Sequence, residues 1–87
     1  LEVENALDKH PDIIESCVSG IEDEKFGEIV GAYIYAKNSI DKEELVSFLK
    51  DKLANYKIPE IIQFTNEALP RIASEKVDRV TVKKLLS

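Results

Sequence analysis

The run from Ile29 to Ala36 constrains the fold of this chain more than any other stretch. Successive side chains of a strand point to opposite faces, and here both sets of alternate positions are small, β-branched or aromatic. One set is Val30, Ala32, Ile34 and Ala36, and the other is Ile29, Gly31, Tyr33 and Tyr35. The pattern predicts a strand that is buried on both faces, so other parts of the chain must cover both of its sides.

A second run rich in β-branched residues, Ile13 to Ile21, precedes it and predicts an antiparallel partner strand. The connection, Glu22 to Glu28, is charged, and we expect it to be a long loop. Its acidic side chains lack the oxygen spacing and the glycine of an EF-hand, which favours a solvated loop over a calcium site. Cys17 is expected to be a small core or sheet residue.

Two segments have the apolar spacing of a helix. Glu2 to Lys9 predicts a short helix that ends at His10-Pro11, because the residue before a proline is pushed out of the α region. A clearer helix begins at Asp41, which is expected to cap the amide of Glu44 while the Glu44 side chain reaches back to the cap. The apolar face of this helix is predicted to cover the sheet and consists of Leu45, Phe48, Leu49 and Leu53.

The C-terminal third of the chain adds a β-like run, Glu60 to Thr65, and a short last helix. Asp78 and Thr81 are the two candidate caps of that helix, and its inward side chains are expected to be Val82, Leu85 and Leu86. The order is therefore helix, strand, strand, helix, strand, loop, helix. It predicts an α+β fold in which a small, mainly antiparallel sheet of about three strands packs against helices.

Composition limits the possible classes of protein. A length of 87 residues allows one small domain, 1–87, and a net charge of -5 makes nucleic acid an unfavourable partner. No apolar run approaches the roughly twenty residues of a membrane span. One cysteine and no secretory signal favour a cytoplasmic location. The sequence contains no methionine, so we expect it to be a piece of a longer protein.

A polar segment opened by a proline, Leu69 to Arg79, contains the main candidate functional residue, Lys76. Pro70 has no amide donor and the residues after it do not alternate, so the segment is expected to be a loop. Local pattern alone describes Lys76 as a solvated surface lysine. His10, the only histidine, has no metal-ligand spacing around it and is expected to serve a helix end or the surface; no metal site is predicted.

Several short motifs are weak signals alone, but their order along the chain is specific. They are Glu2-Val3-Glu4, His10-Pro11, Val18-Ser19-Gly20-Ile21-Glu22-Asp23, Phe26-Gly27-Glu28, Leu53-Ala54-Asn55-Tyr56-Lys57-Ile58-Pro59, Leu69-Pro70 and Lys76-Val77-Asp78-Arg79. Together they resemble the C-terminal domain of the AMP-forming adenylating enzymes. That superfamily includes acyl- and aryl-CoA synthetases, firefly-type luciferases and peptide-synthetase adenylation domains.

The resemblance implies that Lys76 enters the active site of a larger N-terminal domain, where ATP binds with Mg2+ and the carboxylic acid substrate is activated. Attack of a carboxylate on the α-phosphate gathers negative charge, which an ammonium on a long stem can stabilise without covalent chemistry. The resemblance also implies that the domain then rotates. The rotation withdraws the lysine and presents another face for thioester formation with CoA or with carrier-protein pantetheine.

The same resemblance places Tyr56 and Lys57 near the CoA nucleotide. Tyr56 is then either a ring that stacks on adenine or a packing residue at a helix end, and Lys57 is a candidate phosphate contact. Three positions depart from the family pattern. Glu75 stands where glycine is common, and Ile58 and Glu60 stand where some CoA ligases have basic residues.

Three functions follow from these observations. The leading one is the lysine-bearing C-terminal domain of an ATP-dependent acyl- or aryl-CoA synthetase, which is expected to be inactive when isolated. The second is an adenylation domain that loads a carrier protein. The third is a non-catalytic α+β interaction module, which Glu75 favours and which the presence of Lys76 and Arg79 disfavours.

Overall fold

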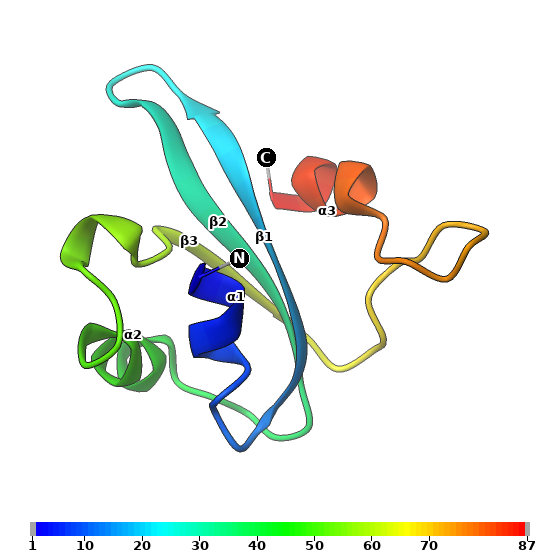
Figure 1. The fold of residues 1–87 in the computed structure, drawn as a ribbon, viewed down its shortest axis with the longest axis horizontal. Helices are drawn as coiled ribbons and strands as arrows, with labels where there is room; N and C mark the ends of the chain where they lie inside the picture. Colours follow the sequence, from blue (N-terminus) through cyan, green and yellow to red (C-terminus); the bar gives the residue numbers. More distant parts are fainter. Residues whose placement is uncertain (1, 87) are drawn as a thin grey trace.

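The computed structural model describes residues 2–86 of the chain and has the predicted α+β architecture. Its elements, in chain order, are α1 (Glu2–Leu7), β1 (Ile13–Asp23), β2 (Gly27–Ala36), α2 (Lys42–Lys50), the 3-10 helix η1 (Asn55–Lys57), β3 (Ile61–Thr65) and α3 (Arg79–Leu86). Every predicted helix and strand is present, which confirms the fold class (Figure 1).

The three strands form one mixed sheet in the order β1-β2-β3. β1 and β2 are antiparallel, as predicted, and Cys17 lies opposite Tyr33. β3 runs parallel to β2, with Gly31 opposite Ile61, so the sheet is antiparallel only in its longer pair. Parallel neighbours need a crossover connection, and here α2 and η1 supply it.

The prediction of a long loop between the first two strands is wrong. β1 continues to Asp23 and β2 starts at Gly27, so only residues 24–26 lie between them. Asp23 closes the turn because its carboxylate accepts hydrogen bonds from the amides of Lys25, at 3.1 Å, and Phe26, at 2.9 Å. Gly27, at φ 80°, adopts the left-handed conformation that glycine tolerates best. The charged residues thus extend a hairpin whose tip projects beyond the helices (Figure 1).

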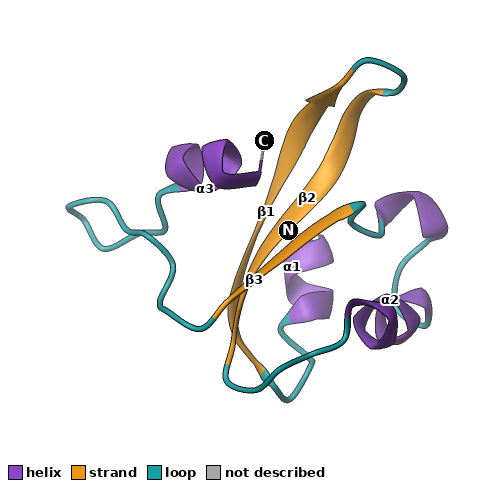
Figure 2. Ribbon diagram, turned by 180° about the vertical axis from the view of Figure 1, so that it is seen from behind, coloured by secondary structure: helices purple, strands orange, loops and turns teal. Residues whose placement is uncertain are grey.

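Both faces of β2 are covered, as its sequence predicts. α1 and α2 lie on one side of the sheet and α3 lies on the other (Figures 1 and 2). The core on the first side includes Leu7, Ala32, Ile34, Leu45 and Leu49, all fully buried. The core on the second side consists of Cys17, Ile21, Leu69, Val82 and Leu86, with Tyr33 and Tyr35 packed against it. The sheet therefore separates two apolar cores, and Cys17 is the core residue that we expected.

The helix caps differ in detail from the predictions. Asp41 caps α2, but its carboxylate accepts from the amide of Glu43, at 3.2 Å, rather than from that of Glu44. Of the two candidates for α3, Asp78 is the cap: it accepts hydrogen bonds from the amide of Thr81 at 3.1 Å and from its hydroxyl at 2.7 Å. Leu85 does not face inward as predicted and is 46% exposed.

His10 lies just after α1, the predicted helix-end position, but it is buried, with 6% of its surface exposed. Its Nδ1 accepts a hydrogen bond from the amide of Asp12 at 3.1 Å, and its ring meets the ring of Phe48 edge-on with centroids 4.9 Å apart. The side chain of Glu44 lies beside it, with Oε1 3.9 Å from Nε2. These contacts give His10 a structural role between α1 and α2.

Candidate functional site

The segment that carries Lys76 lies outside the sheet, as predicted, but it is an ordered hairpin. The amide of Ile72 donates to the carbonyl of Lys76 and the amide of Glu75 donates to the carbonyl of Ile72, both at 2.9 Å. Arg71 pairs with Val77 in an antiparallel bridge, and the amide of Asp78 donates to the carbonyl of Pro70 at 2.8 Å. Lys76 is therefore held on one arm of this hairpin, which we call the Lys76 hairpin (residues 70–78).

Glu75 has a left-handed backbone conformation, with φ of 68°, and is the one non-glycine residue within 2–86 that has a positive φ. A three-residue hairpin loop typically ends with a residue in this conformation, a position that favours glycine. This geometry gives a physical reason for the glycine that the family pattern has at this place, and it makes Glu75 the less favourable residue there. The Glu75 side chain itself is exposed.

The incoming arm of the hairpin is fixed to β1 through Glu15. The Glu15 carboxylate forms an ion pair with Arg71, and its other oxygen accepts from the amide of Leu69 at 3.4 Å. Arg71 also donates to the carbonyl oxygen of Glu75 at 3.0 Å. One arginine therefore connects the sheet to the peptide bond that precedes Lys76.

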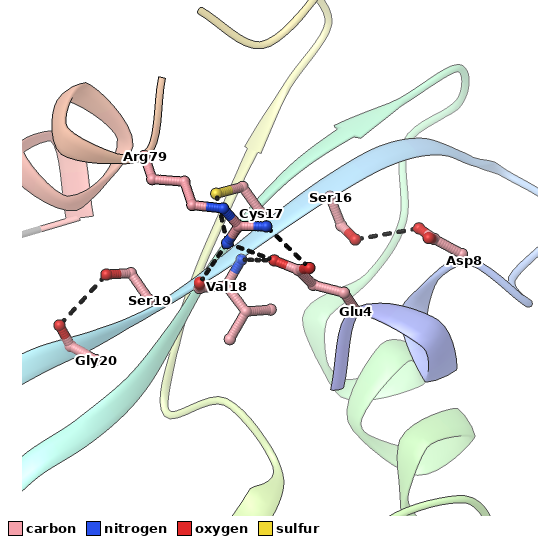
Figure 3. A network of polar contacts seen from close by, with 8 residues as sticks. All are labelled: Glu4, Asp8, Ser16, Cys17, Val18, Ser19, Gly20 and Arg79. Carbon is pink, nitrogen blue, oxygen red and sulfur yellow. Dashed lines mark hydrogen bonds and ion pairs between the residues drawn. The ribbon is translucent and has the colours of Figure 1, made fainter. Parts of the chain in front are cut away.

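The outgoing arm is fixed by Arg79, the first residue of α3 (Figure 3). Its guanidinium donates to both oxygens of the Glu4 carboxylate, at 3.0 and 3.2 Å, and to the carbonyl of Val18 at 3.3 Å. Glu4, only 9% exposed, also accepts from the amide of Val18 at 2.8 Å. Two-point contacts of this kind are geometrically specific, so Arg79 fixes α3 to both α1 and β1.

The electrostatics of this cluster favour the charged pair. Burial raises the pKa of Glu4, but the hydrogen bonds from Arg79 and from the Val18 amide outweigh it and hold that pKa below its usual 4.5. The same pair raises the pKa of Arg79. Burial also raises the pKa of the Cys17 thiol, which lies 3.7 Å from Arg79, so the thiol is neutral. Glu4 and Arg79 belong to the first and last motifs of the sequence, yet only the fold shows that they meet.

The Lys76 side chain is exposed, and within residues 2–86 it forms no hydrogen bond or ion pair. Its ammonium group therefore faces solvent from a hairpin that is anchored at both ends. This arrangement suits a cation that acts on a group supplied from outside this domain.

The other predicted residues, Tyr56 and Lys57, lie on η1. Tyr56 is 79% exposed, so it is not a packing residue at a helix end. The ammonium of Lys57 lies 2.5 Å from the carboxylate of Glu2, and this hydrogen bond raises the pKa of Lys57. A groove of about 290 Å³ opens beside Tyr56 and is lined by Phe26, Glu28, Ile29, Val30, Tyr56, Ile58 and Glu60.

Phe26 is the second aromatic residue of this groove, and the sequence analysis did not predict it as a site residue. It lies at the tip of the β1–β2 hairpin and is 64% exposed. The sequence does contain one indication of such a role, because Phe26 is an aromatic residue within an otherwise charged turn. The structure therefore brings Phe26 and Tyr56 together around one groove.

The structure does not bring Lys76 together with Tyr56 and Lys57. In Figure 1 the Lys76 hairpin is the orange loop at the right, and η1 is the yellow-green turn at the left, above α2. Figure 2, seen from behind, also places them at opposite ends. The domain thus has two separate candidate sites, one a cation on a hairpin and the other an aromatic groove.

Comparison with known proteins identifies the class to which this fold belongs. Residues 2–76 match the family model described as the AMP-binding enzyme C-terminal domain, and the chain belongs to that family. The 2-succinylbenzoate–CoA ligase of Bacillus licheniformis is 42% identical over 78 residues, which are 90% of this chain and 16% of that protein.

Solved structures agree with this assignment. The o-succinylbenzoate CoA synthetase of Bacillus subtilis, in complex with its acyl-adenylate intermediate, is similar with a TM-score of 0.86 and 40% identity over 94% of this chain and 17% of its own. Apo MatB from Rhodopseudomonas palustris has a TM-score of 0.88 and 30% identity over 97% of this chain and 17% of its own. This chain therefore spans about a sixth of the length of these relatives.

Proposed function

We propose that this chain is the C-terminal domain of an ATP-dependent, AMP-forming acyl- or aryl-CoA ligase and that Lys76 stabilises its adenylation transition state. The observation that carries the proposal is the solvent-facing ammonium of Lys76 on an anchored hairpin, in a chain of this family. Relatives named as CoA ligases support it. The isolated domain is expected to be inactive, because the N-terminal domain would bind ATP and the carboxylic acid.

In the first half-reaction a carboxylate oxygen attacks the α-phosphorus of ATP and pyrophosphate leaves. Negative charge develops on the phosphoryl and leaving oxygens, and a positioned cation lowers the energy of that state. Lys76 would supply this cation. Because Glu15 and Glu4 hold the hairpin to β1 and α1, we infer that Lys76 enters and leaves the active site by rotation of the whole domain.

In the second half-reaction the thiol of CoA displaces AMP from the adenylate. We infer that the groove beside Tyr56 holds the CoA nucleotide mainly by stacking, since Phe26 and Tyr56 are exposed rings. Lys57 would reach a phosphate only after leaving Glu2, and the residues that line the groove include the acidic Glu28 and Glu60. Transfer to free CoA rather than to a carrier-protein pantetheine would separate this proposal from the carrier-loading alternative.

Mg2+ in enzymes that use ATP is held by the phosphates of the nucleotide and by one or two carboxylates. Among residues 2–86, no three His, Cys, Asp or Glu side chains form a group able to hold a metal ion. The proposal is that Mg2+ binds together with ATP on the N-terminal domain. No helix within the described part of the chain is long and apolar enough to cross a membrane. A cytoplasmic location is part of the proposal and agrees with the single, unpaired Cys17.

The test of Lys76 is the Lys76→Ala variant of the full-length enzyme. We expect carboxylate-dependent exchange of pyrophosphate into ATP to fall by roughly 100-fold or more, the size typical of removing one transition-state contact. Thioester formation from presynthesised acyl-adenylate is expected to change little. Lys50→Ala, which removes a cation from the exposed face of α2, is the control. Unchanged exchange in Lys76→Ala would refute the assignment.

A further inference from the structure

We propose that Arg71 is a positioning residue for Lys76, an inference that rests on the function proposed for Lys76. Arg71 does not itself reach the reacting groups in this account. It acts by fixing the backbone from which the Lys76 side chain extends.

The geometry of the Arg71 guanidinium supports this role. One of its nitrogens pairs with the Glu15 carboxylate on β1, and the other donates to the carbonyl oxygen of Glu75 at 3.0 Å. That carbonyl belongs to the peptide bond whose nitrogen is the amide of Lys76. The guanidinium is planar and rigid, so a contact at each nitrogen transmits the position of the sheet to this peptide.

The peptide needs such support because Glu75 is left-handed, with φ of 68°. A residue with a Cβ is strained there, and relief of the strain would rotate the backbone just before Lys76. The Arg71 hydrogen bond opposes that rotation. Glycine at position 75 would carry less strain. The peptide before Lys76 therefore needs the Arg71 hydrogen bond because residue 75 is a glutamate.

Arg79 provides the contrast. Its contacts are to Glu4, Val18 and Cys17, all of them in α1 and β1, and none is to the backbone of residues 71–76. Arg79 therefore fixes the end of the hairpin, whereas Arg71 fixes the peptide beside Lys76. The two arginines are expected to affect different properties when they are replaced.

The experiment compares Arg71→Met with the exchanged pair Glu15→Arg/Arg71→Glu in the full-length enzyme. The exchanged pair can restore the ion pair, but a carboxylate at position 71 has no proton to donate to the Glu75 carbonyl. We expect Arg71→Met to lower the kcat of adenylation by about tenfold or more, since displacements near 1 Å have effects up to about 100-fold. The KM for ATP and thioester formation from presynthesised adenylate are expected to stay unchanged.

The exchanged pair is expected to recover only part of the thermal stability lost in Arg71→Met, because arginine at position 15 cannot accept the hydrogen bond from the Leu69 amide, and not to recover the adenylation rate. Recovery of both would show that Arg71 serves only the ion pair and would overturn the inference. A kcat in Arg71→Met within about twofold of the parent would also overturn it.

Measuring Lys76→Ala in the same experiment distinguishes failure of the Arg71 inference from failure of the function proposed for Lys76. If Arg71 acts through Lys76, then Arg71→Met causes no further loss of adenylation in the Lys76→Ala background. A further loss would contradict the positioning role. If Lys76→Ala itself leaves adenylation intact, the proposed function fails and the inference about Arg71 fails with it.

Discussion

At the scale of single residues, Glu75 is the position where local geometry and sequence disagree most. Its φ of 68° lies in the region that favours glycine, and a side chain there costs about 1–2 kcal/mol. The sequence shows that Glu75 departs from the family pattern, but it does not show why glycine is favoured at this position. That preference arises from the left-handed turn, which hydrogen bonds of the Lys76 hairpin close, such as the one from the Ile72 amide to the Lys76 carbonyl.

The variant Glu75→Gly is expected to raise the free energy of unfolding by up to about 1 kcal/mol. Relief of the left-handed strain exceeds the added chain entropy of the unfolded glycine, which is about 0.4–1 kcal/mol. Urea unfolding of the isolated domain measures the change. Ser74→Gly is the matched control. Because Ser74 has no positive φ, glycine there relieves no strain and only increases the entropy of the unfolded chain, which lowers stability. A loss of stability in Glu75→Gly as large as that in Ser74→Gly would contradict this explanation.

At the scale of elements, most of the helices and strands are predictable because their signals are local. Alternation identifies β2, and apolar spacing with Asp41 as a cap identifies α2. The direction of β3 is not local, because it depends on how far the α2 crossover carries the chain before it returns to Gly31. The contact of Glu4 with Arg79 joins residues 75 positions apart, and no spacing rule indicates it.

This contact predicts how stability depends on pH. The folded-state pKa of Glu4 is depressed, so its contribution is complete above its usual pKa of 4.5 and is lost as the pH falls through the lower folded value. The free energy of unfolding is therefore expected to decrease below about pH 4.5. Asp78 contributes in the same direction below its usual 3.8, because hydrogen bonds from Thr81 depress its pKa.

The variant Glu4→Gln tests whether Glu4 causes this decrease in the free energy of unfolding at low pH. It is expected to flatten the fall in stability that begins near pH 4.5 and to leave the steeper part near and below pH 3.8. Chemical unfolding at a series of pH values provides the measurement. An equally steep slope in Glu4→Gln would mean that Glu4 does not titrate as its contacts predict. Glu43→Gln, the same change at an exposed position on α2, is the control.

At the scale of the whole molecule, the two candidate sites belong to the Lys76 hairpin and to η1, which lie on opposite sides of the domain (Figures 1 and 2). The sequence predicted Lys76, Tyr56 and Lys57 as site residues, but periodicity could not place them relative to one another. Nor could it join Phe26 to Tyr56 around a groove, because these residues come from the β1–β2 turn and from η1. Rotation of the domain as one body would allow each end to serve a different half-reaction.

The groove provides the prediction for the second half-reaction. Tyr56→Ala is expected to raise the KM for CoA by roughly tenfold, since one stacked base contributes about 1–3 kcal/mol. Adenylation is expected to be unaffected, because η1, which carries Tyr56, lies on the side of the domain away from the Lys76 hairpin. Steady-state kinetics with varied CoA measures the effect, and Tyr56→Phe, which keeps the ring, is the matched control. An unchanged KM would place the nucleotide elsewhere.

The most direct test of the proposal that one rotating domain carries two sites is a comparison of both half-reactions in Lys76→Ala and Tyr56→Ala of the full-length enzyme. Pyrophosphate exchange reports the first half-reaction, and thioester formation from presynthesised adenylate at limiting CoA reports the second. We predict that Lys76→Ala impairs only the first and Tyr56→Ala only the second. Equal impairment of both half-reactions by either variant would contradict the separation of the two sites.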